Sequence, residues 1–420
     1  MKYLVVILIL LTAHSLKAQS EGDSTKSPGL DYLIESAKNH NSKLEPIELQ
    51  RKIELSKIEQ LNKQPMPMLE LMVDYIPLDF SAKPEYDAFY SQRLMLPRKL
   101  SLNESVNIIG AEKQNILKSQ VHLDLIRQVK TNYFNLYYYD KLIAFNLEYQ
   151  KIMKNLVKSL ESSYASGMGN QSQILKMNNE LQMMIYEQIE MEQMKKVVIN
   201  NLRVLTNLNL TDDIKPKDIN IILNSNPDLD TTRLISLMIS NNPEFKMIEN
   251  MLKQARVEKN IAELEKVPDI TLGGGVRYMA KDNMTNLAFS VGIDLPFMPW
   301  NSKRINAMLD EKSLMEQQAN SVQKSSLNYM KNELQSMVIM LNTLKEKKKY
   351  LNEVLIPQTE QTFNSSLASY SSSTNEFMNL LDSYRKIREA DEKLVKEETE
   401  YLKQLGELEF LLGTQITKIN

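Results

Sequence analysis

The sequence predicts a mostly α-helical protein with a small β part, in which long antiparallel coiled-coil helices are combined with four strands. Three observations predict this fold class. No proline lies between Pro97 and Pro216, and only Pro357 lies beyond Pro299, so helices can run through both stretches without interruption. Apolar residues recur in these stretches with a mean spacing of 3.5 residues. Segments that alternate apolar and polar residues lie between the prolines.

Composition excludes several classes of protein. The chain has 420 residues with 51 basic and 53 acidic side chains, and this net charge of -2 gives no electrostatic basis for binding nucleic acid. Cysteine is absent, which excludes disulfides, cysteine-zinc sites and thiol catalysis. The three histidines lack the spacing of metal ligands. We therefore expect no cofactor, no metal site and no nucleic-acid partner.

The N-terminal residues predict a secretory signal peptide over residues 1–18. Lys2 precedes a nine-residue apolar run that is too short to span a bilayer, and Ala18 offers a small residue for cleavage. No later apolar run approaches 18 residues, so any part of the mature protein that lies within a membrane must be built from strands.

The two halves of the chain repeat one another. Pro268 follows Pro67 at an offset of 201, and Tyr370 follows Tyr164 at an offset of 206. Each unit is expected to run helix, strand, strand, long helix, turn, helix. The predicted organisation is a first repeat over 19–210, a linker or equatorial segment over 211–230, a second repeat over 231–413 and a tail over 414–420.

Each repeat is expected to contain an antiparallel helical hairpin. One seam of ten positions runs from Ile174 to Leu205 and another from Leu380 to Leu412, and eight positions of each seam are apolar. Small and polar residues predict the hairpin turns at 166–170 and 371–375.

Four strands are expected at about 68–78, 88–97, 269–279 and 286–296. The last is the clearest, because apolar residues from Leu287 to Leu295 alternate with small or polar ones. Such alternation is typical of a transmembrane barrel, and equally of a hairpin that covers a soluble core. Because four strands cannot close a barrel, either the hairpins cover a core of their own or several chains pool their strands.

These features resemble the TolC-type outer-membrane efflux protein family over essentially the whole mature chain. The resemblance rests on the repeated order, the Tyr-x-x-Gly turn that begins at Tyr164, and the C-terminal run from Gly406 to Gly413. The second turn departs from the family pattern, since Ser373 replaces its glycine and Asn379 its first aspartate. The first turn also resembles the heavy-metal or cation efflux branch of the family.

The resemblance implies a homotrimer in the outer membrane of a Gram-negative bacterium, with a large periplasmic part. Each chain would contribute four strands to a 12-strand transmembrane β-barrel, and its helices would form a periplasmic tunnel. The implied function is the exit duct of a tripartite efflux or secretion system, which passively conducts substrates expelled by an inner-membrane pump. A periplasmic adaptor, or membrane fusion protein, would join pump and duct, and outer-membrane lipid would surround the barrel.

The resemblance also implies candidate site residues. Asp382 would narrow the periplasmic mouth as a ring of three carboxylates, which favours cations, with Asn379 and Glu376 nearby. Asp382 is also suited to be a solvated charge on a helix face. The expected adaptor contacts are the hairpin tips, formed by Gly167, Met168, Gly169, Asn170, Ser372, Ser373, Thr374 and Asn375.

Two other classes of function explain the sequence less well. A periplasmic coiled-coil adaptor or structural protein without a membrane barrel would explain the helices and the signal peptide, but not the strand pairs. We do not expect an enzyme, because the sequence has no phosphate-binding glycine loop, no serine elbow and no His-Glu-x-x-His.

The 24 methionines could bind soft metals such as Cu(I), but they are better explained as flexible apolar side chains that fill the helix seams.

Overall fold

The computed structural model describes residues 28–61, 63–74, 83–167, 170–211, 214–217, 219–225, 227–372 and 377–416. The expected signal peptide over 1–18 lies outside these ranges. The helices are α2 (Leu30–His40), α3 (Leu44–Leu61), α4 (Pro97–Ala165), α5 (Gln171–Thr206), α6 (Ile219–Asn224), α7 (Thr231–Asn241), α8 (Pro243–Leu264), α9 (Pro299–Tyr350), α10 (Ile356–Ser371) and α11 (Phe377–Leu412), with a π-helical turn η1 (Leu351–Leu355). The strands are β1 (Met68–Asp74), β2 (Glu85–Leu94), β3 (Ile270–Met279) and β4 (Met284–Ile293).

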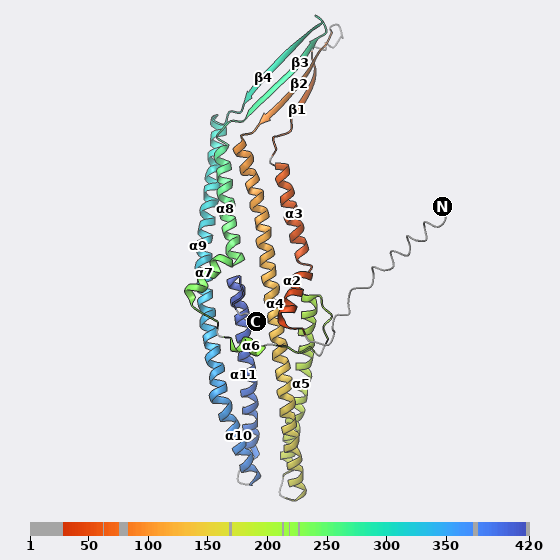
Figure 1. Cartoon of the computed structure of the whole chain (residues 1–420), viewed down its shortest axis with the longest axis vertical. Coiled ribbons are helices and arrows are strands. Elements are labelled where there is room, and N and C mark those ends of the chain that lie inside the picture. Colours follow the sequence, from red (N-terminus) through yellow and green to blue (C-terminus); the bar gives the residue numbers. More distant parts are fainter. Residues whose placement is uncertain are drawn as a thin grey trace, which may run out of the picture.

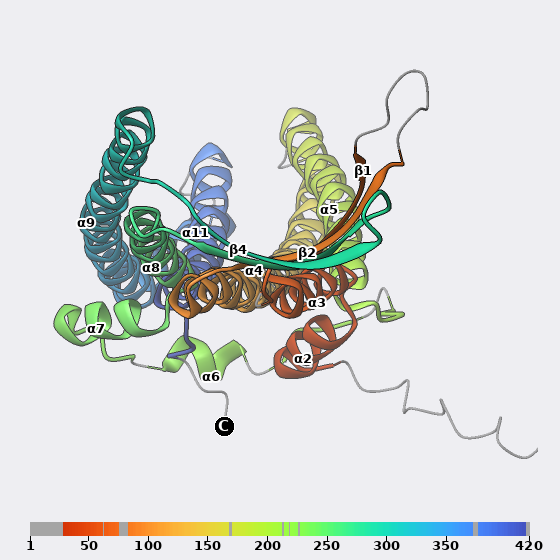
Figure 2. The same ribbon diagram turned by 90° about the horizontal axis from the view of Figure 1, so that it is seen from above.

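The molecule is elongated, with its sheet at one end and its two long hairpins at the other (Figure 1). Viewed along the long axis, α2, α6 and α7 lie on one side of α4, whereas α5, α9 and α11 lie on the other (Figure 2). The sheet is curved in this view. The expected fold class, long helical hairpins with a small four-stranded part, is confirmed.

The longest helix, α4, has 69 residues, so it extends about 100 Å at 1.5 Å per residue. It begins with Pro97 in its first turn, where the missing N–H is not needed. The chain that follows Gly167, whose φ is 78°, reverses into α5. The side chain of Asn170 caps α5 by accepting a hydrogen bond from the N–H of Ser172 at 2.9 Å.

A second long helical path runs through α9, η1 and α10 despite Pro357. Proline removes a donor and its ring conflicts with the carbonyl four residues earlier, here that of Glu353. The π-helical turn η1 contains Glu353, and the N–H of Ile356 bonds to the carbonyl of Leu351, five residues back. The wider turn thus lets the path continue through the proline to Ser371.

The predicted seams are buried at their apolar positions, as at Met184 and Tyr384, except at Ile174, Met191 and Leu394, which are partly buried. Their four polar positions are partly buried and each is bound to α4. The contacts are Gln150 Nε2 to Gln188 at 2.7 Å, Lys195 Nζ to Asp140 at 2.8 Å, Tyr137 Oη to Glu398 at 2.8 Å, and Tyr149 Oη to Asp391. Because each polar group meets a specific partner, these bonds fix the offset of the helices along one another.

The two halves of the chain use equivalent hydrogen bonds where their helices meet at mid-length. Asn41 Nδ2 donates to the carbonyl of Leu205 at 3.3 Å, and Asn242 Nδ2 donates to the carbonyl of Leu411 at 2.7 Å. Each asparagine thereby satisfies a carbonyl near the end of a long helix, which has no partner within that helix.

The sheet is antiparallel in the order β1-β2-β3-β4, and the β2–β3 pair joins the two halves. The strand expected at about 88–97 is displaced to Glu85–Leu94, because Leu96 already caps α4. The strand expected at about 286–296 lies at Met284–Ile293, because Asn283 forms a tight turn with φ of 52° and lets β4 begin earlier. The other two strands begin within a residue of the expected starts, and residues 75–78 lie outside the described ranges.

The segment 211–230, predicted as a linker or equatorial segment, contains the short helix α6. Ile219, Ile222 and Leu223 of this helix are buried in the larger hydrophobic core, which also contains residues of α2, α4 and α11. Burial of this apolar face stabilises a helix that is too short to persist alone.

Candidate functional site

The sheet has one apolar face that the chain leaves uncovered. The register places side chains of all four strands on this face, including Leu71 opposite Ala88 and Val276 opposite Leu287. Phe289 is 85% exposed and Leu287 is 72% exposed. The exposed apolar members of the face are Leu69, Leu71, Val73, Tyr86, Tyr90, Leu94, Ile270, Leu272, Val276, Tyr278, Leu287, Phe289, Val291 and Ile293. A continuous apolar surface of this kind requires an apolar environment.

The opposite face of the sheet, here called the polar face, carries the charged side chains of the four strands together with small residues and some apolar ones, such as Phe89. Arg277 lies directly opposite Asp87 in the register and donates to both of its oxygens, at 2.6–3.1 Å. The ring of Phe89 covers Gly273 and Gly275, where an added Cβ would lie 2.6 Å from ring carbons. These two glycines are therefore needed for the close approach of an aromatic ring to the backbone.

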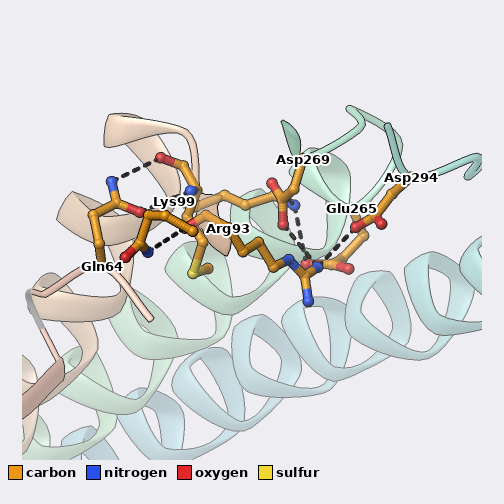
Figure 3. Close-up of polar contacts among 8 residues, drawn as sticks. Gln64, Arg93, Lys99, Glu265, Asp269 and Asp294 are labelled. Atoms are coloured by element: carbon orange, nitrogen blue, oxygen red, sulfur yellow. Dashed lines mark hydrogen bonds and ion pairs between the residues drawn. The ribbon is translucent and has the colours of Figure 1, made fainter. Parts of the chain in front are cut away.

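A cluster of charges joins the sheet to the helices (Figure 3). We call it the junction cluster and define it as Arg93, Lys99, Glu265, Asp269 and Asp294. Arg93 donates to Asp269 and to Asp294, each at 2.9 Å, and Lys99 Nζ lies 3.1 Å from Asp269 and 3.6 Å from Glu265. Lys99 and Asp269 are buried, so neither charge is solvated except by its partners.

Beside this cluster, one side-chain amide extends the strand pairing. Gln64 accepts from the N–H of Met95 at 2.8 Å and donates to the carbonyl of Met95 at 3.2 Å (Figure 3). Both backbone groups of Met95 are thus satisfied at the point where β2 gives way to α4.

At the far end of the molecule, the structure describes three of the eight predicted tip residues. Gly167, Asn170 and Ser372 are exposed, and the ends of α4, α5, α10 and α11 beside them lie at the same end of the molecule (Figure 1). The other five, Met168, Gly169, Ser373, Thr374 and Asn375, lie outside the described ranges, as does Glu376 of the predicted constriction.

The two described residues of the predicted constriction, Asn379 and Asp382, are exposed in the first turns of α11. Asp382 forms an ion pair with Lys386 at 2.8 Å, one helical turn onward. A second pair on the same helix, Glu389 with Lys393 at 2.7 Å, continues this charged surface. The carboxylate of Asp382 therefore has a cation beside it, which the sequence interpretation did not anticipate.

Two ion pairs between the hairpins were missed by the sequence interpretation. Arg385 of α11 donates to both oxygens of Glu180 of α5, at 2.5 and 3.1 Å, and this contact lowers the pKa of Glu180. Arg388 binds Glu187 at 3.1 Å, about one turn further along α11 and two turns further along α5. The charged residues that flank each seam were the available signal, but the sequence gives no offset between the helices.

Next to these pairs lies a buried hydrogen bond between the hairpins. Tyr149 of α4 donates to the carboxylate of Asp391, while Tyr384 donates to the carbonyl of Tyr149 at 2.8 Å. Burial raises the pKa of Asp391 above its usual range, although the hydrogen bond from Tyr149 opposes this. Together, the aromatic side chains and the ion pairs hold the two hairpins against each other.

Among residues 28–416, within the ranges that the structure describes, no three His, Cys, Asp or Glu side chains form a metal-binding group. In the same ranges, no helix combines the length and the apolar character needed to cross a membrane.

Comparisons with known proteins identify the architecture. No family model matches the sequence. The chain is 27% identical to the toxin and drug export protein A of Aggregatibacter actinomycetemcomitans over 203 residues, which are 45% of this chain and 42% of that protein. The similarity thus spans less than half the length of the relative.

Two solved structures are similar over nearly the whole chain. CusC, whose structures concern transmembrane channel formation, gives a TM-score of 0.78 at 15% identity, over 95% of this chain and 96% of that chain. The open outer membrane channel MtrE of Neisseria gonorrhoeae gives a TM-score of 0.72 at 17% identity, over 93% and 90%. The chain has the TolC-type channel fold.

The TolC-type fold that the sequence resemblance implied is therefore confirmed. Its three distinctive parts here are the sheet with one uncovered apolar face, the junction cluster, and the paired hairpin tips. All three are formed by residues from both halves of the chain.

The geometry of the junction cluster predicts that Asp269 and Asp294, which both bind Arg93, contribute very different amounts to the stability of the fold. Asp269→Ala removes the closest partner of buried Lys99, and we expect it to destabilise the fold by about 3 kcal/mol, as for other broken buried pairs. Asp294→Ala removes an exposed partner, 55% accessible, and is expected to cost less than about 1 kcal/mol. Thermal unfolding of both variants in detergent checks this, and equal losses would contradict the assigned roles.

Proposed function

We propose that the protein is the outer-membrane exit duct of a tripartite efflux or secretion system, conducting substrates passively and without catalysis. The observation that carries the proposal is the uncovered apolar face of the sheet, which no described segment of the chain shields. An adaptor without a membrane barrel would not need such a face, so the function without a barrel is not favoured.

The edges of the sheet support an assembly of several copies. β1 and β4 are the edge strands of the described sheet, and each presents a row of backbone groups without strand partners. Within a bilayer every such group needs a hydrogen bond, so β4 of one copy must pair with β1 of the next. We propose three copies and a closed barrel of 12 strands, the assembly that the resemblance to the TolC-type family implies, and 12 strands lie within the range of known barrels.

The barrel proposal is tested by moving a lysine from one face of β4 to the other. Phe289→Lys places a charge on the lipid face near the middle of the strand, at a cost of about 2–4 kcal/mol per chain. Asn286→Lys, on the polar face of the same strand, is the matched control. We expect the first variant alone to lose the heat-resistant oligomer from outer-membrane fractions, as seen on an unheated gel. A mature wild-type chain that stays monomeric in buffer without detergent would contradict the proposal.

We propose that the repeats 19–210 and 231–413 supply equivalent hairpins to a periplasmic tunnel, whose tips meet a periplasmic adaptor joined to an inner-membrane pump. The exposed ends of both hairpins lie together, away from the sheet, and carry small polar residues (Figure 1). A surface of this kind admits close contact with the turns of another helical protein.

The tip proposal predicts where a partner can be trapped in the native bacterium. Photo-reactive side chains at Asn170 and Ser372 should crosslink to a periplasmic adaptor, identified by mass spectrometry. The same groups at exposed Ser159 and Ser365, further along the hairpins, are the controls and should give markedly less product. Absence of adaptor products from both tips would refute the docking site.

We also propose that Asp382, with Asn379 and Glu376, lies at the periplasmic mouth. Three copies of Asp382 would attract cations, and Lys386 would moderate that attraction, because it lies 2.8 Å from the carboxylate. Opening would be a hinge movement of the hairpins, opposed by the pairs of Arg385 with Glu180 and Arg388 with Glu187.

Single-channel recording in a planar bilayer tests the mouth and the gate together. Arg385→Glu turns an attraction into repulsion and should raise the open fraction by roughly fivefold, since a half-exposed pair is worth about 1 kcal/mol. The exchange Arg385→Glu with Glu180→Arg should restore the closed state. Asp382→Asn should lower cation preference without changing the open fraction. An exchange variant that stays open, or an unchanged preference in Asp382→Asn, would refute the respective role.

A further inference from the structure

A groove of about 530 Å³ is lined by residues of α2, α4 and the start of α8. These parts of the three helices lie near the middle of the long axis (Figure 1). We call it the basic groove. Its polar lining consists of Lys38, Asn115, Ser119, His122, Asn241 and Lys246. The volume falls within the range of about 300–1,000 Å³ that is usual for small-molecule sites.

The charges that line the basic groove have one sign. Lys38, His122 and Lys246 come from three different helices, and no aspartate or glutamate is among the described residues that line the groove. Neither Lys38 nor Lys246 forms an ion pair within the part of the chain that the structure describes. Like charges that converge in a concave surface repel one another unless an anion lies between them.

The absence of pairing at the groove contrasts with the helix surfaces beside it. Further along α8, Lys253 lies 2.8 Å from Glu112 and Lys259 lies 3.0 Å from Glu316. On α4, Lys118 lies 3.2 Å from Glu48 of α3. Each of these lysines faces a carboxylate from a neighbouring helix. No carboxylate lines the groove beside Lys246 among the described residues, and its polar neighbours there include amides, a hydroxyl and an imidazole.

We propose that the basic groove binds a small ligand that carries an oxyanion, either a phosphate or a carboxylate. The lysine ammonium groups supply charge, while the Asn115 and Asn241 amides and the Ser119 hydroxyl supply donors that orient an oxyanion. The inference does not depend on the proposed duct, because it rests on the lining of the groove within one chain.

His122 makes the site responsive to pH. Burial lowers the pKa of its imidazole, and the charges of Lys118 and Lys38 lower it further. The charged groups around it are Lys38 from α2, Lys118 on its own helix, which is paired with Glu48, and Lys246 from α8. A bound anion favours the protonated imidazole, so the pKa of His122 rises on binding, and by linkage the ligand binds more tightly as pH falls.

Histidine-selective NMR of the full mature chain in detergent gives a direct test, because the sequence beyond the predicted signal peptide contains only His40 and His122. Titrations are run in inorganic phosphate, in citrate and in chloride at equal ionic strength. We expect phosphate or citrate to raise the pKa of His122 by about 0.5 or more, while His40 stays unchanged. The phosphate and citrate arms distinguish the two oxyanion sources.

Two variants distinguish binding of the oxyanion in the basic groove from general screening of surface charge by the buffer ions. The double variant Lys38→Gln and Lys246→Gln should lose the response of His122 to the oxyanion, whereas Lys154→Gln, an exposed lysine on α4 far from the groove, should keep it. Circular dichroism of each variant in the same detergent reports whether it is folded. A response of His122 that is equal in chloride, or that persists in the double variant, would overturn the proposal.

Discussion

A four-stranded sheet cannot satisfy the hydrogen-bonding groups of its own two edges, and the rest of this structure depends on that constraint. β1 and β4 are the edge strands, and the face between them is covered by exposed leucine, valine, isoleucine and aromatic side chains. In water such a sheet would be an aggregation template. In a bilayer the apolar face is stabilised, but only when the edges are paired, which ties membrane insertion to assembly with further copies.

The long helix α4 connects the sheet to the far end of the molecule. This one helix contacts α3, α5, α8 and α11, so it is shared by both hairpins and by both halves of the chain. Apolar seams supply most of the attraction between the helices. The hydrogen bonds of Gln188, Lys195, Asp391 and Glu398 to α4 fix how far α5 and α11 are shifted along that helix. An apolar seam alone would leave the offset of neighbouring helices poorly specified.

The ion pairs are graded along the length of the molecule. Lys99 and Asp269, next to the sheet, are buried, and breaking such a pair costs about 3–5 kcal/mol. Arg385 and Glu180, near the hairpin tips, leave the arginine 53% exposed, and such pairs are worth about 1 kcal/mol or less. The charges beside the sheet therefore contribute strongly to its attachment, whereas the ion pairs between the hairpins contribute little, and the buried aromatic side chains of Tyr149 and Tyr384 supply most of the contact there.

The sequence by itself determined the helix seams, the alternation of the strands and hence the TolC-type fold, because periodicity is a local property of the chain. It also located the exposed tips at Gly167, Asn170 and Ser372. Strand ends were displaced by two or three residues at β2 and β4, since caps and turns compete with strand pairing there.

Only the tertiary structure decided which charges meet. The contact of Arg385 with Glu180 and the convergence of Lys38, His122 and Lys246 each depend on the rotation and offset of helices. These residues lie far apart in the sequence, and a helix of given periodicity can present the same charges to many neighbours. The partner of a charged side chain is therefore set by packing, which a single sequence does not specify.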